Sequence, residues 1–176
     1  MMALGKYTRT AIALHWILAV LLAAMIALRL YMTDLPRDTP ERSWFFNLHK
    51  SLGLLAAGMI SLRIAWRLRF APPRLEGAAP QWQTAAAKAS HAALYACTVF
   101  MPLSGYLGSA FNKYGVKFFG LALPHWAWDD PRLREIFVTA HQWIANLFIA
   151  LIAIHVAAAV NHALRRDGVF ARMWLA

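Results

Sequence analysis

The chain has 176 residues, of which 60% are hydrophobic, and it carries a formal net charge of +10. Its mean hydropathy of +0.45 is too high for an ordinary soluble domain, so we assign the positive charge to the flanks of membrane segments and not to a nucleic-acid-binding surface. The single cysteine, Cys97, excludes an intramolecular disulfide and a cysteine metal site.

Four apolar segments follow one another along the chain. A helix crosses the ~30 Å hydrocarbon core of a bilayer with about 20 residues, and we predict such helices over residues 10–31, 44–67, 84–110 and 136–165. The longest connection, residues 112–135, contains an aromatic patch that is mixed with charges and is expected at the membrane interface. The sequence therefore predicts one domain, residues 1–176, with an all-α fold: an integral membrane, up-down bundle of four helices.

Basic residues are unequally shared between the two ends of this bundle. The end with both termini and the second connection has ten Lys and Arg residues against two acidic ones, Glu76 and Asp167, whereas the other end has eight against six. By the positive-inside rule, both termini are cytoplasmic. In a bacterial chain this predicts a multi-pass protein of the inner membrane, with the other end facing the periplasm.

Histidines lie at two depths of the predicted bundle. His141 and His155 are 14 residues apart, which on one helix returns to within about 40° of the same face and rises by ~21 Å. His15 lies near the cytoplasmic start of the first helix, and His49 near the periplasmic start of the second. The depths therefore pair His15 with His155 and His49 with His141, each pair drawing one side chain from each of two helices.

Two imidazoles per site, without a carboxylate or thiolate nearby, favour six-coordinate haem b over zinc, which takes about four ligands. The absence of a Cys-x-x-Cys-His motif makes any haem non-covalent. The pattern thus predicts two bis-histidine haem b groups. A histidine proton relay would favour additional carboxylates, and a single intramembrane histidine can equally be a packing residue.

Other polar residues near these sites have less specific interpretations. His162 follows His155 by seven residues, and it is a candidate to exchange protons with a quinone headgroup or simply to end the helix. His91 is expected to neighbour a haem and not to ligate it, and His125 is expected to face solvent. Lys50 directly follows His49, and Arg9 lies near the opposite end; either can pair with haem propionates or anchor the interface.

Several motifs together resemble the bacterial cytochrome b561 family, the short four-helix dihaem membrane cytochromes b. They are YTRTAIALHW at residues 7–16, NLH at 47–49 with Gly53, HAALY at 91–95, PLSG at 102–105, and His141 with His155 and His162. The resemblance covers essentially the whole chain. It implies haem-iron ligation by His15, His49, His141 and His155, and a quinone-linked electron-transfer role in the inner membrane.

The resemblance leaves more than one function open. In short members of the family, superoxide is oxidised at the periplasmic side and ubiquinone is reduced, so our leading hypothesis is an oxidoreductase of this type. Lys50 is a candidate to steer the superoxide anion, although six acidic residues share that face. Alternatively, the chain is a cytochrome b anchor and electron conduit that links a partner dehydrogenase or hydrogenase, docked on residues 112–135, to the quinone pool. A third hypothesis is a proton or metal transporter without haem.

Overall fold

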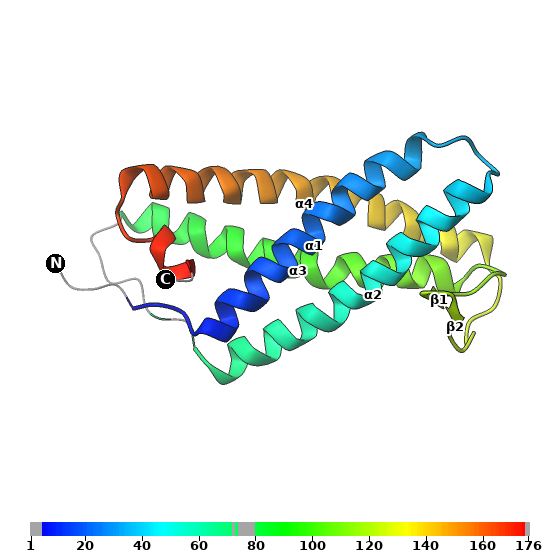
Figure 1. Ribbon diagram of the computed structural model, residues 1–176, viewed down its shortest axis with the longest axis horizontal. Coiled ribbons are helices and arrows are strands. Elements are labelled where there is room, and N and C mark those ends of the chain that lie inside the picture. The colour runs from blue at the N-terminus through cyan, green and yellow to red at the C-terminus, as the bar shows by residue number, and fades with distance from the viewer. Residues whose placement is uncertain (1–4, 72, 74–79, 175–176) are drawn as a thin grey trace.

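The computed structural model describes residues 5–71, 73 and 80–174. Arg74 and Glu76, two of the charges used to orient the chain, lie outside the described residues. Within the described ranges, four long helices form an elongated bundle (Figure 1), which confirms the predicted all-α fold. They are α1 (Arg9–Asp34), α2 (Pro40–Arg69), α3 (Gln81–Ala110) and α4 (Pro131–Arg165). The N-terminal segment and the end of α4 lie at one end of the bundle, and the α1–α2 connection lies at the other (Figure 1).

Among the described residues, α1, α2 and α4 are long and apolar enough to cross a membrane. The fourth predicted crossing, α3, has 30 residues, and serine, threonine, tyrosine and glycine are spread along its apolar sequence. It packs mainly against α4, while α1 packs mainly against α2. Small and hydroxyl-bearing residues of this kind are typical of contacts between membrane helices.

Two helices begin four or five residues before the predicted spans. The Thr39 side chain accepts a hydrogen bond from the backbone N–H of Arg42 at the start of α2. Asp130 accepts from the N–H groups of Arg132 and Leu133 at the start of α4, and these bonds lower the pKa of its carboxyl. Proline follows both caps. The apolar pattern therefore marks the membrane-embedded part of each helix, whereas cap and proline set where the helix begins.

A small hairpin lies in the connection between α3 and α4, where the sequence predicted only an interfacial patch. Its strands are β1 (Lys117–Phe118) and β2 (Leu121–Ala122), joined by Phe119 (φ 46°) and Gly120 (φ 90°). Two successive positive φ angles are typical of a tight hairpin turn. The hairpin is held on α2 by Ser51, which is 2% exposed and whose Oγ accepts the N–H of Phe119 at 2.9 Å.

At the opposite end of the bundle, the chain turns back after α4 into a short 3-10 helix, η1 (Phe170–Met173). Arg172 of η1 is buried, and its guanidinium donates to the carbonyl oxygens of Gly5 at 2.9 Å and Pro73 at 2.5 Å. The indole Nε1 of Trp16 donates to the carbonyl oxygen of Met173 at 2.7 Å. This C-terminal turn, residues 166–174, therefore joins three parts of the chain at the end of the bundle that holds His15.

Candidate functional site

The structure brings the four histidines predicted as haem ligands together in the expected pairs. The ring centroids of His15 on α1 and His155 on α4 are 6.3 Å apart. Those of His49 on α2 and His141 on α4 are 6.4 Å apart. Both pairs thus use α4, and the ~21 Å helical rise between its two histidines separates them.

One ring of the His49–His141 pair is held firmly by α3. Nδ1 of His141 donates to the carbonyl oxygen of Met101 at 2.9 Å and lies 3.2 Å from Ser104 Oγ. Because a carbonyl only accepts, the proton is on Nδ1, which leaves Nε2 with a free lone pair. Metal-binding histidines commonly use this tautomer and this type of hydrogen bond.

A glycine of α3 makes room for the same ring. A Cβ built on Gly105 would lie 3.0 Å from Cε1 of His141 and 3.1 Å from its Nδ1. These distances are tighter than ordinary van der Waals contact, so any side chain at this position would displace the imidazole. The PLSG motif therefore supplies both the glycine that lets α3 lie close to the His141 ring and the neighbouring Ser104.

The other ring of this pair has a buried nitrogen without a partner. Nδ1 of His49 is inaccessible to solvent and makes no hydrogen bond with the described residues. A buried polar atom without a hydrogen-bond partner costs free energy. The described protein atoms do not supply the interaction that would offset this cost at His49.

The pair at the opposite end has a third histidine beside it. The ring centroid of His91 on α3 is 5.6 Å from that of His155, while Trp16 is 5.4 Å from His15 on the other side. The structure therefore agrees with the expectation that His91 lies near this pair. That His91 neighbours a haem and does not ligate its iron stays a prediction. Among the described residues, no group of three or more His, Cys, Asp or Glu side chains is arranged to hold a metal ion.

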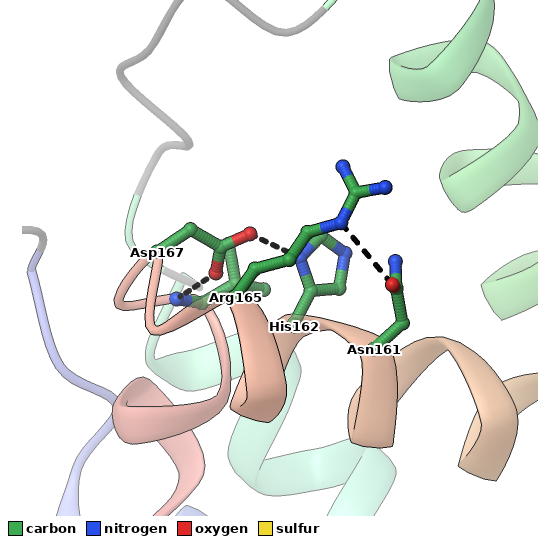
Figure 2. Close-up of polar contacts among 5 residues, drawn as sticks. Asn161, His162, Arg165 and Asp167 are labelled. Atoms are coloured by element: carbon green, nitrogen blue, oxygen red, sulfur yellow. Dashed lines mark hydrogen bonds and ion pairs between the residues drawn. The ribbon is translucent and has the colours of Figure 1, made fainter.

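His162 lies in the last turn of α4 and contacts the residue that follows the helix end. Its Nδ1 is 2.6 Å from Oδ2 of Asp167, and Arg165 donates to Asn161 beside it (Figure 2). The hydrogen bond from His162 is the main cause of the lowered pKa of the Asp167 carboxyl. Both side chains are more than one-third exposed, so this pair is accessible from outside the bundle.

Lys50 and Arg42 both belong to α2 but have different surroundings. Lys50 is half-buried and directly follows His49 in the sequence, whereas Arg42 donates to the carbonyl oxygens of Thr33 in the last turn of α1 and of Leu35 at its C-cap. A shallow, open cavity of about 260 Å³ lies at the α3–α4 connection and was not predicted. Its lining combines both charges: Asn112, Lys113, Tyr114, Asp129, Pro131 and Arg134. His125 is exposed, as expected, with Nε2 2.9 Å from the carbonyl oxygen of Ala110.

A family model described as prokaryotic cytochrome b561 matches residues 6–176. The chain belongs to the prokaryotic cytochrome b561 family. This membership confirms the resemblance drawn from the histidine, glycine and aromatic motifs. It also establishes membrane electron transfer as the general role of the chain, and it implies that the chain binds haem b.

Individual relatives in the cytochrome b561 family cover nearly the whole chain at low identity. Cytochrome b561 homolog 1 of Escherichia coli K12 is 24% identical over 171 residues, which cover 97% of each chain. Cytochrome b561 homolog 2 of the same strain is 29% identical over 164 residues, covering 89% of this chain and 84% of the relative. A Yersinia pestis protein named probable superoxide oxidase CybB is 26% identical over 172 residues, covering 96% of this chain and 95% of the relative.

The residues of this cytochrome b561 chain fit a haem between each histidine pair. A metal-bound imidazole nitrogen lies ~2 Å from the metal and ~1 Å from its own ring centre, so two rings on opposite sides of one metal have centroids about 6 Å apart. Both pairs have this separation. In the described residues, α4 packs closely on α3 but not on α1 or α2, so the helices that bear each pair are separated.

Sequence reasoning missed the residues that support the rings. Met101 acts through its carbonyl oxygen, which any residue type would provide, so its side chain gave no signal. Ser104 and Gly105 lie in the PLSG motif, but the motif does not say which histidine they contact. Ser51 was missed because its partner, Phe119, is 68 residues away in the sequence.

Proposed function

We propose that the chain binds two haem b groups without covalent attachment, one between His15 and His155 and one between His49 and His141. The observation that supports this most strongly is the centroid separation of 6.3 and 6.4 Å in the two pairs. The free lone pair on Nε2 of His141 and the unpartnered Nδ1 of His49 add to it. When bound, haem iron supplies one-electron redox chemistry between axial ligands that the protein provides.

The test of this ligand assignment is a count of haem. A reduced-minus-oxidised spectrum and a pyridine haemochrome assay of the purified protein should give two haem b per chain. One haem per chain would contradict the assignment. A colourless protein would instead support the transporter hypothesis.

We further propose that the chain oxidises superoxide at the periplasmic side and reduces ubiquinone. Two superoxide anions each give up one electron and leave as O₂, and one ubiquinone takes up two electrons and two protons to become ubiquinol. Two observations support this choice of donor and acceptor. A relative of similar length is named probable superoxide oxidase, and Lys50 directly follows His49 in the sequence, so its charge at this end of α2 would attract an anion.

The protein's own part in quinone reduction is to supply protons. We assign this role to His162, whose Nδ1 is bonded to Asp167, so that its Nε2 is left to face a quinone oxygen. The hydrogen bond to the carboxylate of Asp167 orients the ring. A His162→Ala variant should keep both haems and reduce ubiquinone more slowly. Loss of a haem in this variant would contradict the assigned role.

Rapid mixing decides between this function and the electron-conduit alternative. The purified protein, supplied with superoxide and a soluble ubiquinone, should consume superoxide faster than the uncatalysed reaction and form ubiquinol. No acceleration would overturn the superoxide proposal. The conduit alternative is favoured by exposed aromatic side chains on the α3–α4 connection, where Tyr114 is 74% and Trp128 63% exposed, and it predicts that a redox subunit copurifies.

We also propose that the protein lies in the inner membrane with both termini in the cytoplasm. The N-terminal segment and η1 lie at the same end of the bundle (Figure 1), and basic residues are in excess at that end. A reporter that is active only in the periplasm should be inactive when fused to the C-terminus and active when inserted in the α3–α4 connection. The reverse pattern would overturn the orientation.

A further inference from the structure

Two arginines of α2 form a cluster with one tyrosine of α3. Arg63 and Arg67 are one helical turn apart, and Tyr95 lies opposite both. The guanidinium carbon Cζ of Arg67 is 4.9 Å from the centre of the Tyr95 ring, and that of Arg63 is 6.0 Å away. Nη1 of Arg67 also lies 3.5 Å from the Tyr95 hydroxyl. The Tyr95 ring therefore contacts both guanidinium groups, whose two positive charges lie close to each other.

This arginine cluster lies at the level of the His15–His155 pair. Nη1 of Arg63 donates to the carbonyl oxygen of Ala11 at 3.4 Å, one turn before His15 on α1. Tyr95 lies one turn after His91 on α3, and the His91 ring neighbours His155. The cluster thus contacts α1 one turn before His15, and it contains a residue of α3 one turn after His91, the neighbour of His155.

The cluster lacks a negative charge among the residues that the structure describes. The ion pair formed within these residues is His162–Asp167, and the partners recorded for Arg63 and Arg67 are a carbonyl oxygen, a hydroxyl and an aromatic face. Arg63 is half-buried, and a charge within a membrane helix is costly unless it is paired. The guanidinium geometry suits an oxyanion that offers two oxygens, such as a carboxylate.

We propose that Arg63 and Arg67 bind the propionate carboxylates of the haem held by His15 and His155, with Tyr95 orienting the two guanidinium groups. The inference rests on the proposed haem ligation. Arg9, named from the sequence as a candidate propionate partner near this end, lies on α1 with His15 and stays a prediction. A phosphate of an anionic lipid has the same chemistry and is the other source of an oxyanion at this site.

Reconstitution with a modified haem tests the proposal. Full-length protein produced without haem is titrated with haem b and with its dimethyl ester, which keeps the iron and ring but has no carboxylate charge. The wild-type chain should bind the second haem equivalent about 10- to 100-fold more weakly when it is esterified, as expected for losing charge-assisted hydrogen bonds. The Arg63→Gln/Arg67→Gln double variant should lose most of this preference.

Control variants make the result specific. Arg69→Gln removes a charge from the same end of α2, where Arg69 lies over Phe70 and not over Tyr95, and it should keep the wild-type preference. Arg63→Lys keeps the charge but loses the two-pronged geometry, and it should lose part of the preference. An unchanged preference in the double variant, with both haems bound, would overturn the proposal.

Two further outcomes are distinguishable. If the effect of the double variant appears only in nanodiscs with phosphatidylglycerol and not in those with phosphatidylcholine alone, the oxyanion is a lipid phosphate and the proposal is overturned. If the wild-type chain binds neither haem b nor its ester, the proposed haem ligation itself fails. The same measurement therefore separates failure of the carboxylate site from failure of the underlying function.

Discussion

The two histidine pairs have the same ring separation but different surroundings. At the hairpin end, His141 is hydrogen-bonded to the backbone of α3 and packed against Gly105. At the other end, the described residues form no hydrogen bond with the ring nitrogens of His15 or His155, whose neighbours are aromatic rings and, beyond them, the arginine cluster.

This difference has a direct redox consequence. Hydrogen bonds to a ligand, nearby charge and solvent access all change the potential of a haem whose axial ligands stay the same. Under the proposed ligation, identical bis-histidine sites would therefore acquire different potentials from their surroundings. Two distinct midpoints in a redox titration are expected, and variants that act on one end should shift one of them.

The largest expected effect is the loss of one haem. His141→Ala removes a proposed ligand at the hairpin end and should leave one haem per chain. His155→Ala should do the same at the other end. Pyridine haemochrome assays give the stoichiometry, and the remaining midpoint identifies the surviving site. The comparison fails if both variants lose the same haem, or if either keeps two.

A methyl group at Gly105 should act on the hairpin end only. Its Cβ would meet the His141 ring at 3.0 Å, so Gly105→Ala is expected to lower the free energy of unfolding by about 1–3 kcal/mol and to weaken the haem at this site. Gly58→Ala on α2 is the matched control, because a Cβ there meets nothing within 4 Å, and helix propensity favours alanine by roughly 0.5–1 kcal/mol. Thermal unfolding followed at the Soret band measures both, and equal stability of the two variants would rule out the steric explanation.

Removing the Ser51 hydroxyl should release the hairpin from α2. Ser51→Ala leaves the N–H of Phe119 without its acceptor, which is expected to cost about 1–2 kcal/mol. Hydrogen exchange at Phe119 should become faster while the rest of α2 keeps its protection. Ser61→Ala serves as the control, because Ser61 is exposed and donates only within its own helix, to Ala57. Unchanged exchange at Phe119 would mean that other contacts hold the hairpin.

The smallest effect concerns Asp167, whose side chain is partly exposed. Its pKa is lowered by the hydrogen bond from His162, so the contribution of this bond to stability is present above the ordinary carboxyl pKa of ~4 and is lost as the pH falls through the lowered value. Asp167→Asn should therefore match the wild type at low pH and differ from it near pH 7, where quinone reduction should be slower. A difference that persists at low pH would assign another role to Asp167.

The histidine pairing could be predicted from the sequence because it depends on two regular quantities, helical rise and the alternation of direction between consecutive helices. His141 and His155 share one helix, so their spacing alone fixes their separation. The contacts of Gly105, Ser51 and Arg63 could not be predicted in this way. Each depends on how far a neighbouring helix or hairpin has rotated and moved, which is decided by packing between residues far apart in the sequence.

The C-terminal turn has a consequence for assembly. Arg172 and Met173 join η1 to Gly5, Pro73 and Trp16, and η1 follows α4 along the chain. These bonds therefore form only after all four helices have been synthesised. Until then, the carbonyl oxygens of Gly5 and Pro73 lack the Arg172 guanidinium as their hydrogen-bond donor. The packing of this end of the bundle is therefore completed by a side chain, that of Arg172, that is synthesised after all four helices.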